Sequence, residues 1–150
     1  MKNSVLLSFA VGALLLGSAC SKKPAECNAL AGLLNGTIDK IKAQDVQATD
    51  SLDVMKTKVK AQTEVFATFQ TELGKIEITT PEVLAIRGEY QAVATELIAS
   101  SKATSEVIAK ASSGAGDEGL KAEAAAADKK TDESTAKLDG ITGKLNKTCQ

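Results

Sequence analysis

The pattern of apolar and polar positions is helical from Glu26 to the C-terminus. Apolar side chains recur every three or four residues, and no stretch alternates strictly enough to predict a strand. This spacing is typical of coiled-coil-like packing, so it predicts an all-α fold whose core is built from these stripes. The predicted core positions are Leu30, Leu33, Leu34, Ile38, Ile41, Leu52, Met55, Val59, Gln62, Phe66, Phe69, Leu73, Ile76, Val83, Ile86, Tyr90, Val93, Leu97, Ser100, Ser101, Thr104, Val107, Ile108, Leu120, Ala124, Ala127, Thr131, Ser134, Leu138, Ile141 and Leu145.

Turn and capping signals divide this pattern into helical segments. The clearest start is at Thr80, Pro81 and Glu82, which supply a cap, a proline at the first helical position and an acid in the first turn. A loop of Ser, Gly and Ala at 112–116 precedes Asp117, which is the cap candidate of the last segment. The segments are expected at 26–47, 51–76, 81–112 and 117–149.

The boundary between the first two segments has two interpretations. Thr49, Asp50 and Ser51 are good N-cap residues and favour a turn near Ala48, which predicts an antiparallel four-helix bundle. The apolar period also runs through this point. A single first helix would then be about 75 Å long, and the protein would be a three-helix bundle.

The predicted core is uneven along its length. In the antiparallel hairpin of the last two segments, Ser100 and Thr104 face the region of Ala127 and Thr131. These side chains are small or weakly polar, and burial contributes only about 25 cal/mol per Å² of apolar surface. We therefore expect the tip at 100–131 to be the looser part of the bundle.

The first twenty residues form a separate unit. Lys2 precedes an apolar run at 5–16, which is too short to span a bilayer comfortably, and small residues follow at 17–19. This order is that of a secretory signal. Cys20 follows directly, and the combination resembles the lipobox of bacterial lipoproteins. Gly17 departs from the commonest form of that motif, which has Leu at this position.

The resemblance implies a lipid anchor and an address. Residues 1–19 would be removed as a signal peptide, and Cys20 would carry a diacylglyceryl group and an acylated amino terminus, with palmitate as a typical chain. Ser21 then implies sorting to the outer membrane. Residues 20–25 would be a membrane-proximal tether and 26–150 the helical domain. Two other interpretations stay open: an ordinary signal peptide cut before Cys20, which would leave a plain thiol, and an uncleaved anchor.

The cysteine count bears on topology. If Cys20 carries lipid, Cys27 and Cys149 remain as a pair, and cysteines in an oxidising compartment are expected to form a disulfide. Their Cα atoms must then lie within about 7 Å, which four antiparallel helices allow and three do not. The four-helix arrangement is therefore preferred. The alternative is that each cysteine pairs with another chain.

Composition and motifs argue against catalysis and nucleic-acid binding. The chain has no His and a net charge of −1, so it lacks an imidazole base, a usual zinc or haem ligand set and a basic field for nucleic acid. Adjacent acids such as Asp132 and Glu133 point about 100° apart on a helix and do not converge on one atom. We predict no enzyme, no metal site and no cofactor.

The sequence thus favours a non-catalytic cell-envelope lipoprotein that is held to the membrane through Cys20. It would act through protein contacts as a structural or accessory component, with an envelope protein as partner. The alternative is a periplasmic or surface carrier module with an apolar cavity near Phe66, Phe69 and Tyr90. The pattern assigns no ligand-binding residues.

Overall fold

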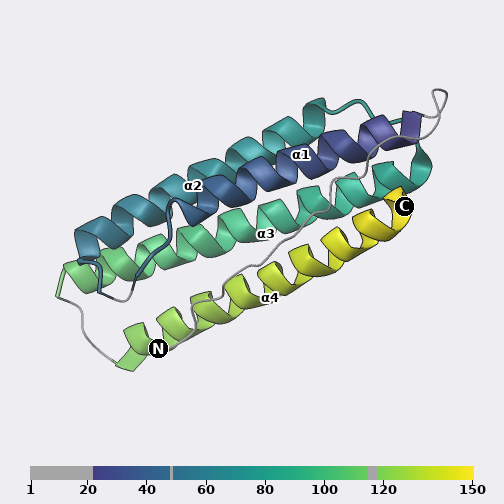
Figure 1. The fold of residues 1–150 in the computed structure, drawn as a ribbon. Coiled ribbons are helices and arrows are strands. Elements are labelled where there is room, and N and C mark those ends of the chain that lie inside the picture. The colour runs from purple at the N-terminus through teal and green to yellow at the C-terminus, as the bar shows by residue number, and fades with distance from the viewer. Residues whose placement is uncertain (1–21, 48, 115–117) are drawn as a thin grey trace.

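Four helices, each antiparallel to the next, make up most of the residues that the structure describes (Figure 1). The computed structural model describes residues 22–47, 49–114 and 118–150. The predicted all-α fold is confirmed. The helices are α1 (Lys22–Lys42), α2 (Leu52–Lys75), α3 (Pro81–Ser112) and α4 (Glu118–Cys149).

The turn between α1 and α2 is where the capping residues predict it. Residues 43–47 and 49–51 are not helical, so the three-helix alternative is wrong; Ala48 lies outside the described residues. The backbone of Ser51 is extended, and its Oγ accepts a hydrogen bond from the Val54 N–H at 3.4 Å. This side chain satisfies a donor that the first turn of α2 would otherwise leave unpaired.

The bounds of α1 differ from the expected ones. The helix begins at Lys22, four residues before Glu26, and ends at Lys42, five residues early. The expected tether at 20–25 is therefore helical from its third residue onward. Pro24 does not prevent this, because the first turn of a helix has no use for its missing N–H. These first residues are largely exposed, so an apolar stripe could not reveal them.

The loop between α3 and α4 also follows the sequence signals. α3 begins with Pro81 at its first position and ends at Ser112. Gly114 has a φ of 82°, a left-handed conformation that favours glycine after a helix C-terminus. The cap candidate Asp117 lies outside the described residues.

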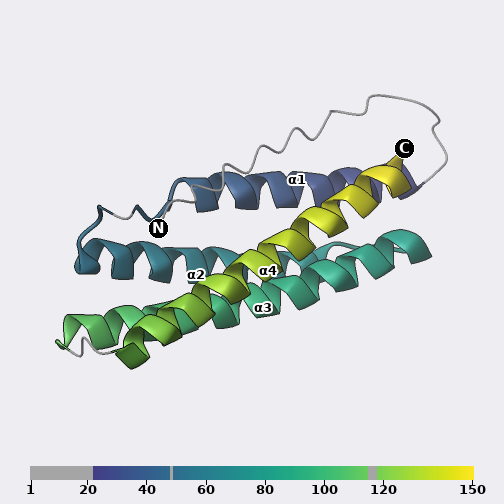
Figure 2. The same ribbon diagram turned by 90° about the horizontal axis from the view of Figure 1, so that it is seen from below.

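Helix α3 is the central element of the bundle. It packs along much of its length against α2 on one side and α4 on the other, whereas α1 packs mainly against α2 and meets α3 and α4 more sparsely. Within the described residues, α2 and α4 make no close backbone contact. Figure 2 shows α4 crossing α3 obliquely, so that its C-terminal end reaches the start of α1.

The apolar core is concentrated in one half of the bundle. We call the end that holds Cys27 and Cys149 the stapled end, and the described residues of 43–59 and 104–131 the far end. Ile108 and Ala127 are buried at the far end but lie outside the main cluster, which agrees with the predicted unevenness. The buried members of the cluster are Cys27, Leu30, Leu34, Ile38, Phe66, Phe69, Leu73, Val83, Ile86, Tyr90, Val93, Ala94, Leu97, Leu138, Ile141 and Leu145.

Two positions correct the predicted stripes. Leu52 was expected in the core, but it is the first residue of α2 and is 41% exposed. Ala94 was not expected there and is 1% exposed. Ala94 lies seven residues before Ser101 and fourteen before Ile108, so it extends the line of these two predicted core positions by one heptad on a helix that packs against two others.

Candidate functional site

The disulfide joins the first helix to the last residue of the last helix. Cys27 and Cys149 are bonded with an S–S distance of 2.01 Å and a Cα–Cα distance of 5.9 Å, across a sequence separation of 122. Cys27 is 4% exposed, and Cys149 is partly exposed against the core cluster. The predicted pairing within one chain is confirmed. The bridge ties α1 to α4, two helices that otherwise meet sparsely.

Glu26 makes a second connection from the same turn of α1. Its carboxylate is 6% exposed and accepts hydrogen bonds from the Thr79 N–H (2.8 Å), the Thr79 hydroxyl (2.9 Å) and the Thr80 N–H (3.2 Å). These donors lie directly before α3, whose own cap residue Thr80 makes no side-chain cap bond. Glu26 thus caps α3 from another helix, where a negative charge also meets the positive end of the helix dipole.

This arrangement favours the charged form of the carboxyl group. Hydrogen bonding by the Thr80 hydroxyl and by the Thr79 backbone, with smaller contributions from the Thr79 hydroxyl and the Thr80 backbone, lowers the pKa of Glu26 to about 2. Partial desolvation acts in the opposite direction and does not outweigh these bonds. Glu26 is therefore an anion at any neutral or mildly acidic pH.

Arg87 of α3 holds the turn between α2 and α3. Its Nη1 donates to the carbonyl oxygen of Ile76, the C-cap residue that follows α2, at 2.9 Å. Its Nε is buried without a hydrogen-bond partner among the described residues. The α2–α3 turn is thus held from α1 by Glu26 and from α3 by Arg87. Sequence reasoning missed Glu26, because its partners lie 53 and 54 residues away and no local pattern marks them.

Three aromatic side chains, Phe66, Phe69 and Tyr90, lie in the core. The rings of Phe69 and Tyr90 meet edge to face with centroids 6.2 Å apart, and Phe66 is buried in the same cluster. The Tyr90 hydroxyl donates to Thr142 Oγ1 at 3.2 Å. Burial raises the pKa of Tyr90 to about 12, only partly offset by the bond to Thr142. Phe69, one of the residues near which the carrier interpretation expected a cavity, also lines a groove between α1 and α2.

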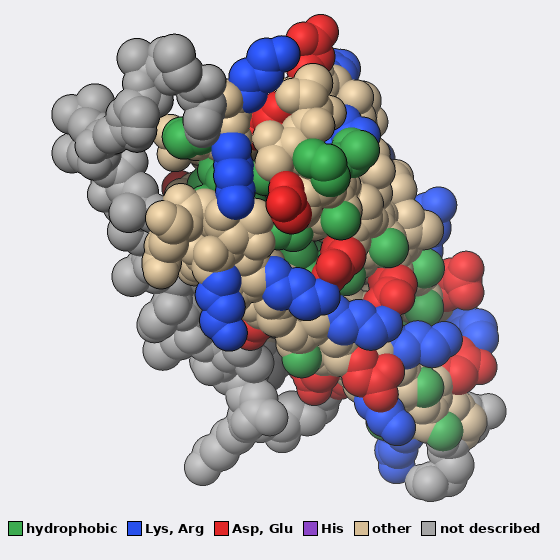
Figure 3. Space-filling model, turned by 90° about the vertical axis from the view of Figure 1, so that its right-hand side faces the viewer, with side chains coloured by type: hydrophobic (Ala, Val, Ile, Leu, Met, Phe, Trp, Pro, Cys, Tyr) green, Lys and Arg blue, Asp and Glu red, His purple; other side chains and the backbone are tan. Residues whose placement is uncertain are grey.

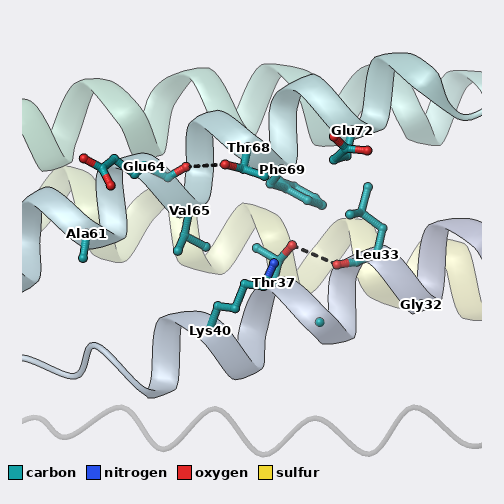
Figure 4. Close-up of a pocket in the computed structure, with 11 residues that line it drawn as sticks. Gly32, Leu33, Thr37, Lys40, Ala61, Glu64, Val65, Thr68, Phe69 and Glu72 are labelled. Carbon is teal, nitrogen blue, oxygen red and sulfur yellow. Dashed lines mark hydrogen bonds between the residues drawn. The ribbon is translucent and has the colours of Figure 1, made fainter.

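A groove of about 370 Å³ lies between α1 and α2 (Figure 4). It opens where Gly32 and Gly36 contribute no side chain. The hydroxyls of Thr37 and Thr68 donate to carbonyl oxygens of their own helices at 2.8 Å each, so they do not offer a free donor. The lining residues are Gly32, Leu33, Gly36, Thr37, Lys40, Ala61, Glu64, Val65, Thr68, Phe69 and Glu72. The groove is therefore a shallow, partly charged surface feature that only Phe69 shares with the predicted aromatic set.

Ion pairs follow the seam between α3 and α4. Glu89 with Lys144, Glu96 with Lys137 and Lys110 with Glu123 form pairs at 2.6, 2.7 and 2.6 Å. A second groove of about 280 Å³ lies on this seam beside the Glu96 pair. Figure 3, which views the molecule from the stapled end, shows basic and acidic side chains interspersed over the surface. The described surface thus has no large field of one sign in that view.

The described residues contain no group of three or more His, Cys, Asp or Glu that could hold a metal ion. Within the same ranges, no helix is long and apolar enough to cross a membrane. The predicted signal peptide and the lipidation candidate Cys20 lie outside the described residues, so the structure says nothing about them.

Comparisons with protein-family models, with curated proteins and with solved structures found no match for this chain. The fold and the disulfide therefore assign this protein to a structural class only. It is an antiparallel four-helix protein whose first and last helices are joined by a disulfide.

Proposed function

We propose that this protein is a non-catalytic cell-envelope lipoprotein, held to the outer membrane by lipid on Cys20, that acts through protein contacts as a structural or accessory component. The observation that carries the proposal is the order of residues 1–20: a basic start, a short apolar run, small residues and then cysteine. The intrachain disulfide supports it, because such bonds are typical of oxidising compartments outside the cytoplasm.

The position of α1 indicates which end of the bundle would face the membrane. α1 begins at Lys22, two residues after Cys20, and its first turns are held by Glu26 and by the disulfide. An acyl anchor on Cys20 would therefore keep the stapled end close to the bilayer. The 32 residues of α4 extend about 48 Å at 1.5 Å per residue, so the far end would project away from the membrane.

The surface supports action through contacts rather than chemistry. The aromatic side chains lie in the core cluster, the two grooves are open to solvent, and the ion pairs along α3 and α4 use side chains that are 39–60% exposed. Such a helical bundle with a mixed polar surface can present a helix face to a partner protein.

The anchor is tested by the mass of the amino-terminal peptide. The full chain is expressed in a bacterial host, and the envelope fraction is digested and analysed. We expect residues 1–19 to be absent and Cys20 to carry a diacylglyceryl group and an amide-linked acyl chain. The matched control is Cys20→Ser, which should lose the lipid and leave the membrane fraction. An unmodified Cys20 thiol at a free amino terminus would contradict the proposal.

The role of the anchor in presenting the bundle is a separate question. Crosslinking in intact envelopes, followed by affinity capture, compares the wild type with Cys20→Ala. We expect partners that crosslink to the anchored protein to be lost or reduced in the variant. The same partners at the same yield in both would show that tethering does not present this domain.

A carrier role is the second candidate, and the α1–α2 groove of about 370 Å³ is the observation that favours it. Extraction of the purified protein with organic solvent, followed by mass spectrometry, tests this role. A lipid or small molecule at one equivalent, in addition to the anchor, would favour the carrier. An empty extract would leave the contact role as the better account.

A further inference from the structure

Adjacent residues in α1 are held by two different helices. Glu26 is hydrogen-bonded to the start of α3, and Cys27 is bonded to the end of α4. α1 otherwise meets both helices sparsely, and its main partner is α2. The orientation of this one turn therefore decides whether the Cys27 sulfur faces Cys149.

The two connections differ in when they can form. The disulfide exists only after oxidation, whereas the hydrogen bonds of Glu26 need only the carboxylate and the folded α2–α3 turn. That turn is held independently, because Arg87 donates to the carbonyl oxygen of Ile76. In the dithiol protein, the hydrogen bonds of Glu26 thus still link the turn that carries Cys27 to the start of α3 at the stapled end.

We propose that Glu26 is a positioning residue for the Cys27–Cys149 disulfide: by binding Thr79 and Thr80 it holds the first turns of α1 in place and keeps the two thiols facing each other. The carboxylate does not touch either sulfur in this scheme. It acts by raising the effective concentration of one thiol near the other. Because the hydrogen bonds already order the first turns of α1, forming the disulfide costs less conformational entropy. The proposal does not depend on lipid at Cys20.

The reaction is a two-electron oxidation by a small disulfide, here oxidised glutathione. The thiolate of one cysteine attacks the oxidant and releases one glutathione thiolate, which takes up a proton. The second cysteine then attacks the mixed disulfide and releases the other glutathione. One S–S bond forms in the protein, one breaks in the oxidant, and two protons and two electrons pass to two molecules of glutathione.

The test measures the equilibrium constant of this exchange. The full chain carries Cys20→Ser so that only two thiols remain. It is equilibrated at pH 7 with defined ratios of reduced and oxidised glutathione, alkylated, and weighed by mass spectrometry. We expect Glu26→Gln to lower the equilibrium constant about tenfold, since bonds to a charged acceptor are the strong ones. Thr79→Val removes the hydroxyl donor of Thr79 and keeps its backbone N–H, and it should lower the constant about threefold.

Glu82→Gln is the matched control, because Glu82 is an exposed acid in the first turn of α3 at the same end and should leave the constant unchanged. An equilibrium constant of Glu26→Gln equal to that of Glu82→Gln, with the helical spectrum intact, would overturn the proposal. So would a lowered melting temperature in both redox forms with an unchanged constant, because this shows a role in stability alone. If Glu26→Gln does not fold, Thr79→Val decides: an unchanged constant for this milder variant also overturns the proposal.

Discussion

The stapled end and the far end are built from the same helices with the same spacing, yet different contacts hold them together. The stapled half buries large side chains almost completely: Tyr90, Leu30, Leu34, Leu73 and Val83 are each no more than 1% exposed. Toward the far end the buried side chains are serines and an alanine together with Val59 and Ile108. Heptad spacing is therefore enough to form helices, but the size of the residues at the spaced positions decides how much apolar surface they bury.

Polar contacts take over at the far end. Lys58 donates to the carbonyl oxygen of Asp45 at 2.7 Å and to the Asp50 carboxylate at 2.8 Å, and Gln62 donates to the carbonyl oxygen of Gln44 at 3.0 Å. The hydrogen bond from Lys58 is the main reason that the pKa of Asp50 lies below its ordinary value. These hydrogen bonds thus hold the α1–α2 loop against α2. The stapled end, by contrast, is held by a disulfide and by a buried carboxylate.

The largest expected effect concerns the covalent bond. Replacing both cysteines, Cys27→Ala with Cys149→Ala, should lower the free energy of unfolding by about 4 kcal/mol, because the bridge closes a very long loop and restricts the unfolded chain. Urea unfolding of the wild type and the double variant measures this loss. A loss below about 1 kcal/mol would show that the non-covalent contacts hold the stapled end without help.

The second prediction compares two isoleucines on α3, one in the stapled half of the bundle and one at the far end. Ile86 and Ile108 are both on α3 and are 5% and 7% exposed, but only Ile86 belongs to the main core cluster. We expect Ile86→Ala to cost about 3 kcal/mol and Ile108→Ala about 2 kcal/mol, since the cost rises with the packing that is lost. Chemical unfolding of the two single variants tests the order. Equal losses, or the reverse order, would contradict the contrast between the halves.

The smallest effect depends on pH and concerns Glu26. Its pKa falls from 4.5 to about 2 on folding, so the group stabilises the folded state above pH 4.5 and loses this contribution as the pH falls toward 2. The difference in melting temperature between the wild type and Glu26→Gln should therefore be constant from pH 7 to 5 and shrink between these two pKa values. In Glu82→Gln, an exposed acid nearby, no such change is expected. A difference that persists unchanged at pH 2 would show that charge on Glu26 is not the cause.

Much of the fold could be predicted from the sequence because its signals are local. Apolar residues spaced by three and four, the Ser51 cap and Pro81 at the start of α3 each act within a few residues of the feature they predict. The disulfide could be predicted from the number of cysteines and from the Cα–Cα distance that a disulfide can span. The first turn of α1 was missed because its exposed residues carry no apolar stripe, and Leu52 was misplaced because the pattern does not show where a buried face ends.

The site depends on contacts that no local pattern records. Glu26 is one acid among many in the sequence, and only the return of the α2–α3 turn to the start of α1 brings the donors of Thr79 and Thr80 to it. The groove between α1 and α2 likewise arises from how two helices lie against each other around Gly32 and Gly36.

The sequence by itself determined that this protein is helical, where three of its four helices begin, and that Cys27 and Cys149 pair, because these properties depend on period, capping and the number of thiols. The tertiary structure decided that α3 is central, that α1 packs mainly on α2, and that a carboxylate from α1 caps α3. These outcomes depend on which helix faces meet, and many pairings of apolar stripes satisfy the same period. Cys20 remains a prediction of the sequence, and the mass of the amino-terminal peptide is its test.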